Sequence, residues 1–457
     1  MSLPGRVPPL LHSLARLLPE QAGDAVSWSG RRWWWAGRLD VEGLALGSLQ
    51  MLAAAVAAYA SSTGRGTRIS FTSDGAAAAF ASYAHVRINN RQAQGFAPLS
   101  GFRPTADGWV RLHANYPHHE RALFTALGAE HPGEVDAAVR GRTSAEVEAV
   151  VTAHGGLAAE VRTPQAWADS EQGRVLQAEP WLRLELDAVD PALPPRPGNA
   201  GPLDGLRVLD LTRVIAGPSG SRLLGALGAD VLRVDPPAIP ELEDQYVDTG
   251  FAKRSAVADL AGAEARRRLR ALLAQADVVL TAYRGGSMAR LGLDPASLRA
   301  EYPQLAVVSL DAWGDRGPWA ERRGFDSIVQ AATGISYLYG GAGEDGGWRP
   351  GALPVQALDY ATGLGMSAAA LALVAARRQG VAGSTHLSLA RTAQELLALP
   401  GPPPGTEPAA LPGPALRSGF GDYGSLTYVP PPLQINGHQL EYPWLPPRYG
   451  SADLAWR

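Results

Sequence analysis

Residues 205–235 constrain the fold more than any other part of this chain. The apolar residues of 206–211 are typical of a short buried strand, and a Gly-Pro-Ser-Gly break follows at 217–220. The pattern at 222–228 predicts an amphipathic helix that ends at a glycine, and 230–234 predicts a second strand. Together these elements predict a strand–helix–strand unit.

Two functional interpretations of this unit stay open. In the first, it binds a dinucleotide, with Asp235 on a ribose hydroxyl and a phosphate at the start of the helix. In the second, it is an ordinary strand–turn–helix with a glycine-rich turn. Gly217 and Gly220 lie three positions apart, so the turn lacks the GxGxxG fingerprint of NAD-binding proteins. We therefore do not expect NAD to bind.

Composition narrows the class of protein. The chain has 457 residues, enough for two or three domains, with 46% hydrophobic and 19% charged residues. A net charge of −3 provides no electrostatic footprint for nucleic acid or an anionic membrane. The chain has no cysteine, which excludes disulfides, thiolate metal sites and a cysteine nucleophile. No apolar run looks long enough to span a membrane and the first residues make a poor signal peptide, so a cytoplasmic enzyme is expected.

Five stretches resemble, in the same order, segments of the class III CoA-transferases, the CaiB/BaiF family. They span about residues 205–395 and are DLTRVIAGPSGSRLLGALGADVLRVDPP, GFAKRSAVADL, ADVVLTAYRGGSMARLGL, RRGFDSIVQAATG and PVQALDYATGLGMSAAAL. The resemblance implies an α/β fold with a Rossmann-like, doubly wound CoA-binding domain and a smaller α/β domain. It also implies an enzyme that moves CoA from an acyl-CoA thioester to a carboxylic acid through an aspartyl anhydride and thioester relay.

The resemblance assigns site residues by position. It makes Asp359 the nucleophile. Pro236 stands where the transferases often have an arginine, so the phosphate site is expected to differ. The positions that match CoA contacts of the family are Val214, Ile215 and Ala216 in the first turn, Ala282 and Tyr283 beside the adenine, Arg290 near the phosphates, and Arg323, Phe325 and Asp326 in a further segment.

Lys253 is the only lysine of the chain and lies in the matching Lys-Arg-Ser segment. An ammonium is a compact point charge that suits phosphate, so we interpret Lys253 as a contact to a CoA phosphate or pyrophosphate. The alternative is a lysine on a solvated turn with no role in binding.

The residues around Asp359 also have two interpretations. An aspartate at a helix start is usually an N-cap. In the catalytic interpretation, an apolar strand at 353–358 leads to Asp359, and the free amides of a helix over 361–376 hold the carboxylate ionised. Gly363 and Gly365 would then let the pantetheine arm approach.

Rival functions remain. A non-catalytic acyl-CoA-binding or scaffold protein is the main alternative. The family also contains acyl-CoA racemases that use the histidine of a Gly-His-Asp motif, but this chain has Phe325 there, and phenylalanine moves no proton. His113, His118 and His119 invite a metal, yet adjacent helical residues point about 100° apart, so no metal is predicted.

The organisation predicted from the sequence is unusual. Residues 39–75 and 357–390 share the order helix, glycine break and strand, which predicts an internal repeat. Material that resembles the family's later half precedes its CoA-binding half, so the chain is predicted to be permuted or fused. The family's interlocked homodimer is the expected assembly. The predicted units are an N-terminal segment at 1–38, the later half with its small domain at 39–190, a linker at 191–201, the CoA-binding half at 202–399 and a proline-rich tail at 400–457.

Overall fold

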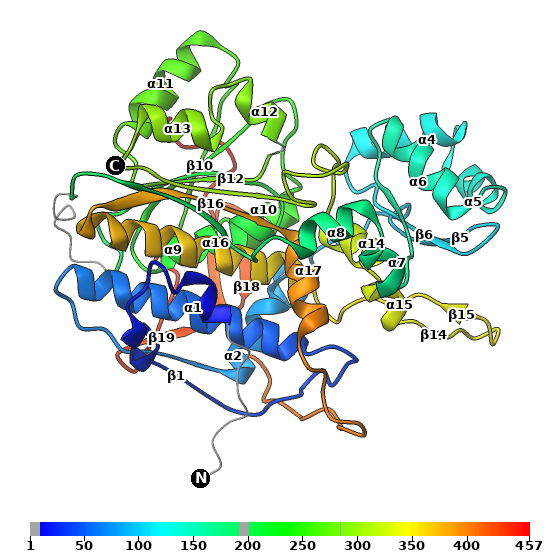
Figure 1. Cartoon of the computed structure of the whole chain (residues 1–457), viewed down its shortest axis with the longest axis horizontal. Coiled ribbons are helices and arrows are strands. Elements are labelled where there is room, and N and C mark those ends of the chain that lie inside the picture. The colour runs from blue at the N-terminus through cyan, green and yellow to red at the C-terminus, as the bar shows by residue number, and fades with distance from the viewer. Residues whose placement is uncertain (1–9, 192–200, 284) are drawn as a thin grey trace.

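The computed structural model describes residues 10–191, 201–283 and 285–457, so most of the predicted linker and the first nine residues lie outside the described part. A seven-stranded sheet forms its centre, in the order β11-β10-β9-β12-β13-β16-β8 (Figure 1). All neighbours are parallel except β8, which runs antiparallel to β16 at one edge. The strands are β8 (Arg183–Ala188), β9 (Arg207–Leu211), β10 (Asp230–Asp235), β11 (Arg254–Val257), β12 (Val278–Thr281), β13 (Ala306–Asp311) and β16 (Val381–Ser388).

This large parallel sheet confirms the prediction of a mixed α/β fold. The six parallel strands follow the chain order 3-2-1-4-5-6, which is the order of doubly wound nucleotide-binding sheets. Successive residues of a strand face opposite sides, so Val208 and Leu209 are both buried, but in different cores. One core contains α9 (Ala216–Ala226) and α16 (Ala357–Ala376), and the other contains α11 (Ala263–Leu273) and α13 (Pro295–Glu301).

Helix α9 corrects the expected break at 217–220, because all four residues are helical. The reason is close packing rather than chain flexibility. A Cβ on Gly220 would lie 2.2 Å from the carbonyl oxygen of Gly363 in α16, and a Cβ on Gly363 would lie 1.9 Å from the carbonyl oxygen of Ala216. The glycines therefore let two core helices touch backbone to backbone, which is a different task from admitting pantetheine.

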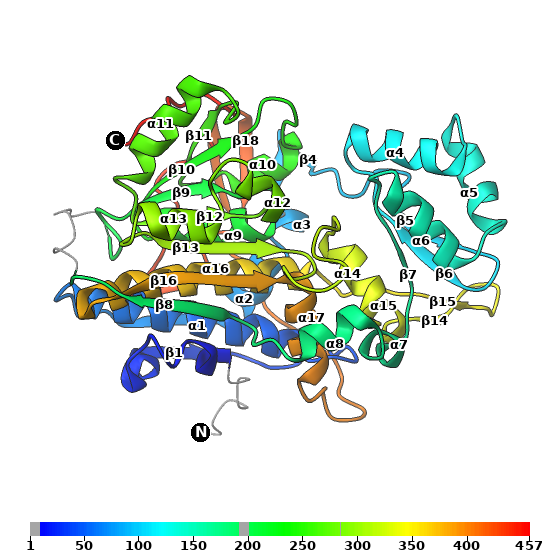
Figure 2. The same ribbon diagram turned by 45° about the horizontal axis from the view of Figure 1, so that its top comes forward.

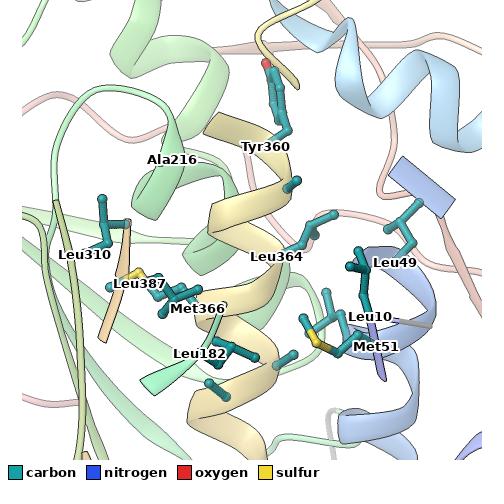
Figure 3. Close-up of a cluster of buried hydrophobic side chains, with 14 of the residues drawn as sticks. Leu10, Leu49, Met51, Leu182, Ala216, Leu310, Tyr360, Leu364, Met366 and Leu387 are labelled. Atoms are coloured by element: carbon teal, nitrogen blue, oxygen red, sulfur yellow. The ribbon is translucent and has the colours of Figure 1, made fainter. Parts of the chain in front are cut away.

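Helix α16 is the centre of the larger core. Every residue of α16 is buried, and the apolar helix α1 (Val41–Ser62) packs along it (Figure 2). Figure 3 shows Leu364 of α16 on the side of Leu49 and Met51 of α1, whereas Met366 lies on the other side of α16, beside Leu387 of β16. Both helices are long and apolar enough to cross a membrane, which the sequence analysis did not anticipate. Their apolar windows are 94% and 100% buried inside the protein, as in core helices.

The two stretches predicted to repeat have the same order of elements. After α1 come β2 (Ile69–Thr72) and α2 (Ser73–Phe80), and after α16 come β16 and α17 (Leu389–Ala398). The two second helices are capped alike. The hydroxyl of Thr72 accepts from the N–H of Gly75, and that of Ser388 accepts from the N–H of Arg391.

A small domain with its own core stands beside the large sheet (Figures 1 and 2). It has a three-stranded antiparallel sheet and three helices. The elements are β5 (Gly101–Pro104), β6 (Trp109–Leu112), α4 (Pro117–Leu127), α5 (Pro132–Arg140), α6 (Ser144–Ala153) and β7 (Ala158–Glu160). Helix α14 (Asp326–Ala332), which comes between strands β13 and β16 of the large sheet in the chain, packs against β6 and β7.

The C-terminal region is more ordered than a proline-rich tail. Its strand β18 (Gly424–Tyr428) pairs with β3 (Arg87–Ile88), and β19 (Leu433–Ile435) pairs with β2. It also contains β17 (Arg417–Gly421) and β20 (His438–Gln439). The end of the chain is therefore fastened to the first half by backbone hydrogen bonds.

Candidate functional site

A cavity of about 490 Å³ opens at the carboxyl ends of the parallel strands. Its wall contains the last residues of several strands or the residues just after them: Leu211, Val234, Ala282 and Asp311. Strands β9 and β12 are neighbours here, and the connections run in opposite directions on either side of them. Ligands of open α/β sheets bind at such a switch point, outside the carboxyl ends of the strands.

The turn between β9 and α9 is strained beside this cavity. Val214 has a φ of +69°, in the left-handed region that β-branched residues rarely adopt. Its N–H donates to Oε2 of Glu241 at 2.9 Å, which fixes the turn. Backbone strain of this kind concentrates at ligand-binding sites, where surrounding contacts maintain it.

Glu241 belongs to a buried network of charges. Its carboxylate accepts from Arg233 at 2.9 Å and also from the hydroxyl of Tyr116. Arg233 in turn binds Asp235 through two hydrogen bonds, of 2.7 and 2.9 Å. The arginines lower the pKa of Glu241 against the opposing effect of burial. Asp235 is therefore engaged by Arg233 and is not directed to a ribose.

The predicted CoA contacts divide into two groups. Arg290 lies just after α12 (Gly285–Ala289) and donates to Ser287, a residue of the cavity wall. Ile215 and Ala216 pack toward the large core at the start of α9. Asp326 and Asp359 lie behind the wall. The predicted contacts that line the cavity are Val214, Ala282, Tyr283, Arg323 and Phe325.

Lys253 lies in the interior and not on a solvated turn. It is 1% exposed, and its ammonium donates to the carbonyl oxygen of Pro218 at 2.9 Å, to Ser221 Oγ at 2.7 Å and to Asp210 Oδ2 at 3.3 Å. Burial lowers the pKa of Lys253 to about 8, although Asp210 opposes the shift. The lysine therefore ties the start of α9 to the end of β9. A phosphate contact would require it to leave these partners.

Asp359 lies in the first turn of α16, but it is not the N-cap. The helix begins at Ala357, so Gln356 is the cap residue, and residues 353–356 form no strand. The loop is held instead by Gln330, whose Oε1 accepts from the N–H of Leu353 at 2.8 Å. The N-cap interpretation and the predicted strand are both wrong, because the helix starts earlier than the apolar pattern indicated.

The carboxyl group of Asp359 is 6% exposed, and the described contacts include no hydrogen bond to it. Its backbone N–H donates to Asp326 Oδ2 at 3.0 Å, and Gln330 donates to the other oxygen of Asp326. Burial, with the neighbouring Asp326 second, raises the pKa of Asp359 well above its ordinary value. Burial also raises the pKa of Asp326 to about 6. Helix amides were expected to hold Asp359 ionised, and the structure corrects this expectation.

Three residues of the cavity wall were missed by the sequence analysis as ligand contacts: Tyr116, His118 and His119. They come from the small domain, nearly 100 positions before β9. The imidazole of His119 is 4% exposed with no described partner for Nδ1, and burial lowers its pKa to about 3. The histidine cluster was visible in the sequence, but it was judged only as a metal site. Among the described residues no group of His, Cys, Asp and Glu could hold a metal ion.

Phe325 occupies the position of the racemase histidine and lies within a group of aromatic rings. His113 stacks on it with ring centroids 4.3 Å apart, and Tyr116 lies parallel at 6.3 Å. Burial lowers the pKa of His113 to about 3, so this imidazole is neutral at physiological pH. The ring group joins the small domain to the start of α14.

The doubly wound sheet, the switch-point cavity and the strained turn define an α/β protein with a nucleotide-type binding crevice. Residues 203–401 match the model of CoA-transferase family III.

Several characterised proteins are similar to the same region. A probable fatty acyl-CoA transferase of Mycobacterium tuberculosis, Rv3272, is 35% identical over 43% of this chain and 52% of its own length. The succinate–glutarate CoA-transferase of Agrobacterium fabrum is 35% identical over 40% of this chain and 50% of its own. The chain thus spans about half the length of the curated relatives that it matches. A crystal structure of Rv3272 covers 44% of this chain and 58% of its own, with 35% identity and a TM-score of 0.41.

Proposed function

We propose that this protein transfers CoA from an acyl-CoA thioester to a carboxylic acid, with Asp359 as the nucleophile. The observation that carries the proposal is that Asp359 is buried and its carboxyl group has no described hydrogen bond. The backbone N–H of Asp359 donates to Asp326, the residue that follows the cavity-lining Phe325. Buried carboxyl groups normally have hydrogen-bond partners, so one without them is a candidate for chemistry. The relatives' names supply the substrate classes of the proposal: fatty acyl-CoA or a short dicarboxylate.

The proposed relay has four steps. A carboxylate oxygen of Asp359 attacks the thioester carbonyl, the C–S bond breaks, and a mixed anhydride and CoA thiolate result. The thiolate attacks the aspartyl carbonyl and releases the first acid. The carboxylate of the acceptor then attacks the aspartyl thioester and displaces the thiolate again. Attack of the thiolate on the acyl carbonyl of the new anhydride yields the new acyl-CoA and restores Asp359.

Asp326 supplies the second carboxyl group of this site. Two buried carboxyl groups in one site do not both ionise easily, so they share a proton near neutral pH. Asp326 accepts two hydrogen bonds that favour its charged form, so the proton rests on Asp359, which becomes the anion that the first step needs only when it loses that proton. Asp326 is therefore proposed as a positioning residue as well as a neighbour of CoA.

We further infer that the two halves of one chain complete one site. Residues 39–190 contribute Tyr116, His118 and His119 to the cavity wall, and residues 202–399 contribute the strand ends. The permuted or fused order of the halves fits this division of labour. The family resemblance also predicts a homodimer, which static light scattering measures directly.

Acyl-enzyme trapping tests the proposal. Incubation with an acyl-CoA followed by hydroxylamine should convert Asp359 to a hydroxamate that peptide mass spectrometry locates, and Asp359→Asn should fold but form none. The matched control is Asp40→Asn, because Asp40 also lies at the start of a long apolar core helix, α1. The Asp40 carboxylate is an N-cap that accepts from Gly43 at 2.8 Å and pairs with Arg32 at 2.7 Å.

Asp40→Asn should therefore keep full trapping. Hydroxamate formation by Asp359→Asn would refute the nucleophile. Tight acyl-CoA binding by the unaltered protein without trapping or exchange would favour the non-catalytic acyl-CoA-binding alternative.

A further inference from the structure

Arg111 is a buried cation without a described partner. It lies on β6 of the small domain and is 7% exposed. Its Nε has no hydrogen-bond partner, and the contacts of the described residues include no ion pair to its guanidinium. Every other buried arginine discussed above has a carboxylate or carbonyl partner. A buried charge without a counter-ion destabilises the folded protein. A ligand of opposite charge would supply the missing counter-ion.

The surroundings of Arg111 hold the guanidinium in place without neutralising it. The rings of Phe96 and Phe102 lie against it, with centroids 4.5 and 4.9 Å from Cζ. Arg103, on the neighbouring strand, adds a second positive charge that opposes it. Burial and this repulsion lower the pKa of Arg111 to about 10. An incoming anion would relieve both effects.

Arg111 faces the acid pair rather than the main cavity. Alternate residues of a strand share a face, so Arg111 points to the same side as His113, which stacks on Phe325. Asp326 follows Phe325 in the chain, and the negative charge of its carboxylate favours the charged form of Arg111. Arg111 does not line the 490 Å³ cavity, where Arg213, Arg322 and Arg323 are found. The arginines of the cavity suit the phosphates of CoA, whereas Arg111 lies within electrostatic range of Asp326, which accepts from the N–H of the proposed nucleophile.

We propose that Arg111 binds the carboxylate of the acid acceptor and directs it to Asp359. A guanidinium presents a planar fork of N–H donors that pairs with a carboxylate through two parallel hydrogen bonds. The site would be built jointly, because Arg111 comes from the small domain and Asp359 from the CoA-binding half. This inference rests on the proposed function, which supplies an acid as the second substrate.

Arg111→Met tests the proposal because methionine keeps the apolar bulk between Phe96 and Phe102 and removes the fork. With C4 to C8 mono- and dicarboxylic acids as acceptors, the KM for the acid should rise about 10- to 100-fold, as expected for lost charge-assisted hydrogen bonds. The rate of Asp359 acylation by acyl-CoA and the Kd for CoA should stay unchanged. Arg111→Lys should give an intermediate KM for the acid, since lysine keeps the positive charge without the planar fork of donors. This variant also replaces Arg111→Met in the test if the methionine variant fails to fold.

The matched control is Arg103→Met, on the adjacent strand, where the arginine already pairs with Asp136 at 2.7 Å. It should leave the KM for every acid unchanged. An unchanged KM in both Arg111 variants would overturn the proposal. An equal loss in the acylation step or in CoA affinity would also overturn it, because Arg111 would then be a CoA contact or a structural residue.

Direct binding separates this proposal from the proposed function. Calorimetry should detect binding of the same acids to the unaltered protein, and Arg111→Met should weaken it. If the protein forms no acyl-enzyme but binds acids through Arg111, the transferase proposal fails and the acid site stands. If transfer occurs and acid binding ignores Arg111, the acid site fails alone.

Discussion

The backbone N–H of Asp359 donates a hydrogen bond of 3.0 Å to Oδ2 of Asp326, which brings two carboxyl groups 33 positions apart into one buried site. This contact links the start of α16 to the start of α14, and through Phe325 to the wall of the cavity. Burial raises the pKa of both carboxyl groups, and the charge of Asp326 raises the pKa of Asp359 further, so the charge state of Asp359 depends on that of Asp326. The pH dependence of acylation and of stability both depend on this arrangement.

Asp326→Asn should shift the pH dependence of Asp359 acylation. Acylation needs the Asp359 anion, so its rate should rise with pH in the unaltered protein. Asparagine removes the like charge yet still accepts from the Asp359 N–H, so the pKa of Asp359 should fall and the profile should move to lower pH by about one unit. Hydroxylamine trapping between pH 5 and 9 measures this. A profile that stays in place or moves to higher pH would contradict the coupling.

Asp359→Asn should stabilise the fold, and more so at pH 8 than at pH 5. A carboxyl group whose pKa is raised in the folded state favours folding only while protonated, and this contribution is lost as the pH rises through the folded-state pKa. The neutral amide avoids that loss, so the gain at pH 8 should be about 1–3 kcal/mol in the free energy of unfolding. Urea titrations at both pH values provide the numbers.

A suitable comparison for that experiment is Asp107. Hydrogen bonds from the N–H and hydroxyl of Ser144 lower its pKa, so Asp107→Asn should be destabilising at pH 8. If both variants changed stability in the same direction, the raised pKa of Asp359 would be in doubt.

Gly363→Ala should destabilise the protein by about 3 kcal/mol, because the new Cβ would lie 1.9 Å from the carbonyl oxygen of Ala216 and would force α9 and α16 apart. Gly365→Ala, one half-turn along, is the control. Its Cβ would meet Leu387 at 3.1 Å, a flexible side chain, and alanine favours the helix by about 1 kcal/mol. Thermal unfolding should therefore separate the two variants clearly. Equal effects would mean that the helix contact is less tight than described.

Lys253→Met should reduce stability by about 3–5 kcal/mol, since it leaves Asp210 buried without its cation. Affinity for CoA and for dephospho-CoA should fall by the same factor, through the loosened β9–α9 turn. Calorimetry with the two ligands checks this. A selective loss for CoA would restore the original interpretation of Lys253 as a contact to the 3′-phosphate.

Much of the fold follows from local patterns in the sequence. Consecutive apolar residues such as Val208 and Leu209 are sufficient to predict strands covered on both faces, since each side chain must face one core or the other. The repeated order of helix, break and strand could also be predicted from the sequence, because it depends on residue type and spacing. Asp359 was assigned as the nucleophile through its place in a family segment, and the structure shows that it is buried.

Tertiary structure decided the tasks of residues whose partners are distant in the chain. Gly363 meets Ala216 in a helix crossing, and Lys253 meets Asp210 across the sheet, which are contacts that the sequence did not indicate. Arg111 and Tyr116 reach the site from the small domain without any local signal. Local patterns record which side chains must be buried, because burial depends on composition and period. Local patterns do not indicate which buried groups contact each other, since those contacts depend on how elements that are far apart in the sequence pack together.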